Sequence, residues 1–68
     1  MNQIAMKLKS IRIQNGMSQR RFADFIGVPL GTYKSWEYSI SVPDYRYRDL
    51  LYKLDPSLIR LWERDKMR

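Results

Sequence analysis

Five residues between positions 30 and 35, four with side chains and one glycine, are suited to recognising a ligand. Lys34 supplies a charged donor, and the hydroxyls of Thr32 and Ser35 can donate and accept hydrogen bonds. Leu30 offers an apolar contact, and Gly31 would let another molecule come close to the backbone. This combination is suited to binding rather than to making or breaking covalent bonds.

Catalytic and metal-binding side chains are scarce in this sequence. It contains no cysteine and no histidine, which excludes the usual zinc sites and the Ser-His or Cys-His nucleophile pairs. The seven Asp and Glu are scattered, with no close pair in an apolar setting that would raise a pKa. The sequence therefore predicts a protein that is not an enzyme and uses neither a metal nor a cofactor.

The size and charge of the chain limit the kinds of partner that it is expected to bind. Its 68 residues predict a single domain, covering residues 1–68. Thirteen Lys and Arg against seven Asp and Glu give a net charge of +6 and a pI of about 10.0, which favours a nucleic-acid partner. The lack of cysteine suits a reducing cytosol, and no apolar run approaches the ~20 residues of a membrane span. We expect a cytoplasmic protein with no membrane association.

The apolar residues fall at helical spacing, and the first two helices are well marked. The first covers about residues 3–15 and is stopped by Asn15-Gly16. The second follows Ser18, a candidate N-cap. It ends at Gly27, because glycine adopts a positive φ at the lowest energetic cost.

Prolines and a loop divide the rest of the chain into three more helices. Pro29 is expected to open the third, residues 39–42 read as a loop, and Pro43-Asp44 is expected to start the fourth. Asp55-Pro56 then opens the fifth. The fold class expected is all-α, a compact orthogonal bundle of five helices.

The third helix is expected to have two distinct faces. Tyr33, Trp36 and Ile40 are predicted to lie on its inner side, with the two aromatic residues in the core. The outer side is expected to carry Leu30, Gly31, Lys34, Ser35 and Tyr38.

Residues 18–38 thus predict a helix-turn-helix, since two short helices meet at a tight glycine turn. The second helix of such a pair lies in the major groove of DNA. Over about residues 7–61 the sequence resembles the Cro and cI-type (Xre-like) regulator family, which has a lambda-repressor-like fold. The residues that carry the resemblance are Arg12, Met17-Ser18-Gln19, Phe22-Ala23, Ile26-Gly27-Val28, Thr32-Tyr33, Trp36-Glu37 and Pro43.

An outward-facing recognition helix would contact double-stranded DNA in two ways. Lys34 can donate to guanine O6 or N7, Thr32 and Ser35 can serve a base or a phosphate, and Leu30 can press on a thymine methyl. Gly31 would allow the DNA to approach the helix backbone. Contacts to phosphates are expected from a second set of residues, namely Gln19, Arg20, Tyr38 and Arg46.

The resemblance also implies a structural ion pair between Arg12 and Glu37, which would link the first helix to the end of the recognition helix. The sequence departs from the family at Ser39, where glycine is usual, and at Ile40 and Ser41, where basic residues are common.

The function expected is a sequence-specific transcriptional regulator, a repressor that binds a palindromic operator as a homodimer. The fifth helix is rich in apolar residues, so Leu58, Leu61 and Trp62 are the expected dimer interface, although Trp62 could instead cap the core. The resemblance implies a phage or mobile-element setting, which includes the regulation of an anti-CRISPR operon. Two alternatives remain: an antitoxin that binds a toxin and represses its own operon, and a non-specific architectural nucleic-acid binder. Only residues 63–68 lie beyond the last apolar stripe, so no separate toxin-binding tail is expected.

Overall fold

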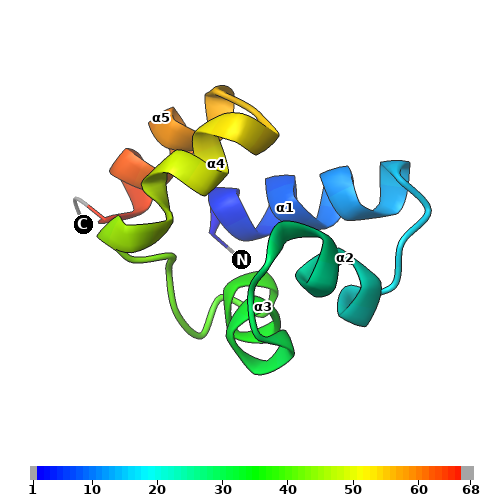
Figure 1. The fold of residues 1–68 in the computed structure, drawn as a ribbon. Helices are drawn as coiled ribbons and strands as arrows, with labels where there is room; N and C mark the ends of the chain where they lie inside the picture. Colours follow the sequence, from blue (N-terminus) through cyan, green and yellow to red (C-terminus); the bar gives the residue numbers. More distant parts are fainter. Residues whose placement is uncertain (1, 67–68) are drawn as a thin grey trace.

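This computed structural model describes residues 2–66 of the chain. They contain five α-helices and one short 3-10 helix, η1, joined by loops (Figure 1). The helices are α1 (Gln3–Gln14), α2 (Gln19–Ile26), α3 (Leu30–Glu37), η1 (Tyr45–Tyr47), α4 (Arg48–Leu54) and α5 (Ser57–Lys66). The predicted all-α architecture with five helices is confirmed.

Short polar residues and glycines set the boundaries of the first helices. The Asn2 side chain accepts a hydrogen bond from the Ala5 N–H at 2.8 Å, and the Ser18 side chain accepts one from the Arg21 N–H at 3.1 Å. Gly27 ends α2 with a φ of 77°, in the left-handed region that favours glycine. The predicted N-cap at Ser18 and stop at Gly27 are therefore confirmed.

The predicted start of the fourth helix at Pro43-Asp44 is wrong. The Asp44 carboxylate accepts a hydrogen bond from the Arg46 N–H at 2.9 Å, and this contact opens the single 3-10 turn of η1. Tyr47 then departs from α-helical geometry, with φ −96° and ψ 6°, so α4 begins only at Arg48. Asp44 is therefore the N-cap of η1, and this single 3-10 turn leads into α4.

An aromatic chain runs through the core. Phe22 contacts Tyr33 with ring centroids 5.3 Å apart, Tyr33 contacts Trp36 at 6.4 Å, and Trp36 contacts Tyr47 at 4.9 Å, all edge to face. Ile4, Leu8, Leu51 and Leu58 surround it and are fully buried. The prediction that Tyr33 and Trp36 belong to the core is confirmed.

Two of the three residues expected at a dimer interface are instead part of this core. Leu58 is fully buried, Trp62 is 7% exposed, and the Trp62 indole N–H donates to the buried carbonyl of Pro43. Side chains that already pack inside one chain offer no surface to a second. Only Leu61 keeps part of its side chain accessible.

The helices divide into two groups on either side of α1. In Figure 1, α1 crosses the middle of the molecule, α4 and α5 lie at its upper left, and α3 lies at the lower edge beside α2. Contacts join α1 to both α5 and α3, α2 to α3, and α4 to α5. This arrangement leaves one face of α3 open at the end of the molecule farthest from α4. None of the helices in residues 2–66 combines the length and the apolar character needed to cross a membrane.

Candidate DNA interface

The open face of α3 consists of four residues, Gly31, Lys34, Ser35 and Tyr38, which we call the recognition face. Gly31, Lys34 and Tyr38 are exposed and Ser35 is half-buried. Tyr33, Trp36 and Glu37 lie on the opposite side and are buried, as the turn of about 100° per residue requires. The recognition face therefore projects directly away from the core.

Leu30 and Thr32 flank this face. Both are half-buried, and Leu30 packs against the core. A base contact from Leu30 would thus involve only the edge of its side chain. Ser35 keeps its hydroxyl close to the helix, because its Oγ donates to the Gly31 carbonyl at 3.1 Å.

The prediction that Ile40 shares the inner side of this helix with Tyr33 and Trp36 is wrong. The helix ends at Glu37, and Ser39 adopts a φ of 62°, which turns the chain before Ile40. As a result the Ile40 side chain is 76% exposed. The positive φ also explains why a glycine is usual at position 39.

A buried carboxylate fixes α3 to the rest of the domain. Glu37 is 2% exposed and accepts hydrogen bonds from Arg12 Nε at 3.0 Å and Arg12 Nη2 at 2.9 Å. It accepts two more, from the Tyr33 hydroxyl and from Gln19 Nε2. The remaining Arg12 nitrogen, Nη1, donates to the Met17 carbonyl at 3.0 Å. The ion pair implied by the resemblance is present, and it joins α1, α2, α3 and the loop before α2.

These contacts shift the acidity of the groups in the network. Burial alone would raise the pKa of Glu37, but the hydrogen bonds from Arg12, Tyr33 and Gln19 outweigh it and lower that pKa below its ordinary value. Burial, together with the hydrogen bond to Glu37, raises the pKa of the Tyr33 hydroxyl. At neutral pH the network therefore holds a carboxylate surrounded by protonated donors.

The lowered pKa of Glu37 predicts a pH dependence of stability. Because the folded pKa lies below the ordinary value of 4.5, the carboxylate stabilises the fold above about pH 4.5, and this contribution is lost as the pH falls through the folded value. Urea unfolding is measured from pH 7 down to pH 2 in steps of about one unit. As the pH falls, Glu37→Gln should lose less stability than the natural chain. If the free energy of unfolding changed with pH in the same way for both proteins, the pKa of Glu37 would be the same in the folded and unfolded states.

Three of the four expected phosphate contacts, Gln19, Tyr38 and Arg46, already have partners within the protein. Gln19 Nε2 donates to Glu37 Oε1 and to the Tyr38 hydroxyl, both at 3.1 Å, so this amide is held at the edge of the recognition face. Arg46 pairs with Asp44 at 3.0 Å, and the hydrogen bonds that its guanidinium donates to that carboxylate raise the pKa of Arg46. Arg20 is exposed on the first turn of α2. A phosphate would have to share Gln19 and Arg46 with these partners.

The Tyr33 hydroxyl and the Gln19 amide are members of the network that sequence reasoning missed, since Gln19 was expected only as a phosphate contact. Tyr33 was expected only as a core residue, yet its hydroxyl donates to Glu37. A signal was present, because residues four apart lie on the same face of a helix and can contact each other.

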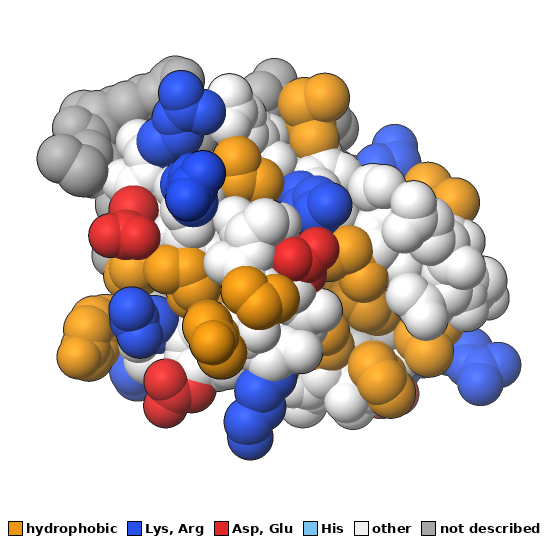
Figure 2. Space-filling view, turned by 90° about the horizontal axis from the view of Figure 1, so that it is seen from above, with side chains coloured by type: hydrophobic (Ala, Val, Ile, Leu, Met, Phe, Trp, Pro, Cys, Tyr) orange, Lys and Arg blue, Asp and Glu red, His pale blue; other side chains and the backbone are white. Residues whose placement is uncertain are grey.

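The described basic side chains form no cluster on the side of the molecule that lies far from α3. Figure 2 views the molecule from above, onto the side far from α3, and its described Lys and Arg side chains lie scattered among apolar and acidic ones. This side therefore presents no continuous basic patch among the described residues that would compete with the recognition face for DNA.

Two short helices joined at a left-handed glycine, with the second one held by a buried ion pair and open on its outer face, define a helix-turn-helix domain. A family model described as Helix-turn-helix matches residues 8–47, more than half of the chain. The chain therefore belongs to the Cro/cI-type, Xre-like helix-turn-helix family, and it has that family's lambda-repressor-like fold. It matches no curated protein and no solved structure.

Membership of this family makes the chain a DNA-binding transcriptional regulator. The family is generally non-enzymatic. Within the described residues, no group of three or more Asp or Glu side chains lies close enough together to hold a metal ion.

Proposed function

We propose that this protein is a repressor that binds an inverted-repeat operator as a homodimer. The observation that carries the proposal is the recognition face of α3, which is open to solvent while the Glu37 network fixes the same helix from behind. A rigid helix with Lys34 and Ser35 outward can present donors to base edges in a major groove. Pro29, the N-cap of α3, has no polar side-chain atom, so the first-turn N–H groups are left for water or a phosphate.

The need for two copies follows from how little one helix can specify. A single recognition helix reads only a few base pairs, which is too few to mark one site in a genome. Two copies related by a two-fold axis double the site and place their helices about 34–36 Å apart, one turn of the DNA. The protein would act in the cytoplasm, by occupying the operator DNA.

Selection from random duplex DNA tests this proposal. The natural chain should recover an inverted repeat whose half-sites are centred about 10–10.5 base pairs apart. Recovery of unrelated sequences would instead support the non-specific architectural alternative. The antitoxin role, the phage or mobile-element setting and the anti-CRISPR operon stay predictions of the resemblance.

Gly31 gives a test of how closely DNA approaches the recognition face. A Cβ atom added there would meet no described atom within 4 Å, so the fold itself does not require glycine at this position. Alanine is a better helix former, so Gly31→Ala should hold or raise stability by up to about 1 kcal/mol. If the DNA contacts the helix backbone, the same change should lower affinity about tenfold in a fluorescence-anisotropy titration, which corresponds to about 1.4 kcal/mol. Unchanged affinity would remove Gly31 from the interface.

A further inference from the structure

The Tyr38 hydroxyl is the outer end of a row of hydrogen bonds that begins inside the protein. Arg12 Nε and Nη2 donate to the Glu37 carboxylate, which also accepts from Gln19 Nε2 at 3.1 Å. The same Nε2 atom donates to the Tyr38 hydroxyl at 3.1 Å. Glu37 is 2% exposed, Gln19 is half-buried and Tyr38 is 54% exposed. The row therefore leads from the buried ion pair to the recognition face.

The Glu37 carboxylate fixes which way the Gln19 amide points. An ionised carboxylate only accepts hydrogen bonds, so the amide has to turn its Nε2 rather than its Oε1 toward Glu37. Nε2 carries two hydrogens, and its second partner is the Tyr38 hydroxyl oxygen. The amide thus occupies a lone pair of this oxygen and leaves the hydroxyl proton for another acceptor.

Inside the protein the Tyr38 proton has a distant acceptor. Gln19 Oε1 lies 3.3 Å from the hydroxyl oxygen, whereas an ordinary O–H···O bond measures about 2.7–2.8 Å. A phosphate oxygen is charged and only accepts, so its hydrogen bond with a hydroxyl is shorter and stronger than one between neutral groups. A phosphate can therefore take over this proton while Nε2 keeps its bond to the hydroxyl oxygen.

We propose that the Tyr38 hydroxyl donates to a DNA phosphate and that Gln19 is a positioning residue, which acts on this phosphate through Tyr38 without binding it. The inference rests on DNA binding by the recognition face, proposed above, and not on the homodimer. It joins into one unit two residues that the sequence predicted as separate phosphate contacts.

The place of the two residues in the fold suits a phosphate rather than a base. In a helix-turn-helix complex, the N-terminal residues of the second helix reach the base edges, and the first helix crosses the DNA backbone. Tyr38 follows the C-terminal end of α3, and Gln19 is the first residue of α2. Their hydrogen bond joins the far end of the recognition helix to the helix that crosses the backbone. A hydroxyl at this point meets the edge of the groove.

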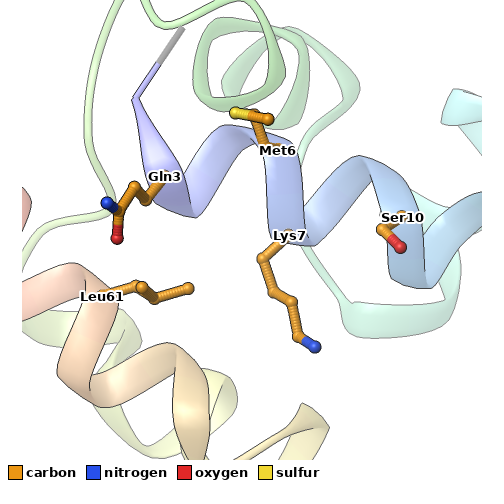
Figure 3. A pocket seen from close by; sticks show the side chains of 5 residues that line it. All are labelled: Gln3, Met6, Lys7, Ser10 and Leu61. Carbon is orange, nitrogen blue, oxygen red and sulfur yellow. The ribbon is translucent and has the colours of Figure 1, made fainter.

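The groove between α1 and α5 lies away from this path to the DNA. It has a volume of about 340 Å³ and is lined by Gln3, Met6, Lys7, Ser10 and Leu61 (Figure 3). In Figure 3 the pale green ribbon of α3 lies on one side of α1, and Leu61 of α5 lies on the other. Lys7 is the one charged residue of the five, and its Nζ lies 3.5 Å from the Asp55 carboxylate. A phosphate at the recognition face is therefore not shared with this groove.

A double-mutant cycle tests whether the two side chains act as one. Tyr38→Phe removes the hydroxyl, and Gln19→Met removes the amide but keeps an unbranched side chain of similar length. In a fluorescence-anisotropy titration on the duplex recovered by random selection, each change should lower the affinity about tenfold. The double variant should also lose only about tenfold, because both changes remove the same contact. A loss of about 100-fold for the double variant, or no loss for either single one, would overturn the proposal.

Phosphate ethylation interference identifies the group that Tyr38 reaches. Ethyl groups on several phosphates of a half-site should block binding of the natural chain. Tyr38→Phe and Gln19→Met should both become insensitive to ethylation at the same one of these phosphates. A general loosening of the fold would weaken binding without this effect at one phosphate. Insensitivity at different phosphates, or a relaxed base preference in the motif that Tyr38→Phe selects, would overturn the proposal.

Tyr52→Phe is the matched control, because Tyr52 is 58% exposed but lies on α4. It should bind like the natural chain, and a loss equal to that of Tyr38→Phe would overturn the proposal. Circular dichroism verifies folding, and Gln19→Ala, with the same expected result, replaces Gln19→Met if that variant does not fold. All of these outcomes leave DNA reading by α3 intact. A natural chain that selects no motif would instead overturn the proposed function itself.

Discussion

Replacing Glu37 with alanine should lower the free energy of unfolding by about 3–5 kcal/mol. The change leaves the Arg12 guanidinium, whose side chain is only 14% exposed, without its carboxylate. It also removes the acceptor of the Tyr33 hydroxyl and one acceptor of the Gln19 amide. For a domain of this size, the loss corresponds to a decrease in Tm of about 12 °C or more.

Thermal unfolding followed by circular dichroism measures this effect. Glu63→Ala is the matched control, because Glu63 is exposed on α5 and its loss should change stability by less than about 0.5 kcal/mol. Equal Tm values for the two variants would mean that the Glu37 network contributes nothing to the fold.

Trp62→Ala is expected to be nearly as destabilising, at about 3–5 kcal/mol. The indole is 7% exposed, and its N–H donates to the carbonyl of Pro43 in the loop after α3. Alanine would leave a cavity between α5 and this loop and a buried carbonyl without its donor. Total stabilities of domains are only about 5–15 kcal/mol, so this change should remove a large fraction of the stability of the fold.

Urea unfolding separates this account from the interface predicted from sequence. Trp62→Phe keeps most of the buried apolar area but not the N–H donor, so its stability should fall between those of the natural chain and Trp62→Ala. A Trp62→Ala protein that stays fully stable yet sediments as a monomer would place Trp62 at the dimer interface after all.

The parts of the fold that depend on local chemistry could be predicted from the sequence. Ser18 and Gly27 bound α2 because an N-cap hydroxyl and a left-handed glycine act within a few residues. Tyr33 and Trp36 lie in the core because their helical spacing sets them on one face. The Arg12–Glu37 pair joins residues 25 apart in the chain, and the resemblance to a family was needed to predict it.

The parts that depend on packing between distant segments could not be predicted in this way. The apolar residues of α5 are too many to say which ones meet α1 and α4, so Trp62 was listed at the dimer interface with the core as its alternative, and it closes the core. Ile40 was placed with the inner residues of α3, because the sequence does not show that Ser39 adopts a positive φ and turns the chain. The start of α4 was misplaced because the sequence does not show that a 3-10 turn, capped by Asp44, precedes this helix.

The central claim is that α3 reads bases through its recognition face, and selection from random duplex DNA with a Lys34→Ala variant tests it most directly. Lys53→Ala serves as the control, since Lys53 is also exposed on a helix but lies on α4. Lys34→Ala should relax the preference at one symmetric pair of positions, at a cost of about 1–3 kcal/mol, while Lys53→Ala should recover the motif of the natural chain. An unchanged motif for Lys34→Ala, with only the salt dependence of binding reduced, would make Lys34 a phosphate ligand and contradict base reading by this side chain.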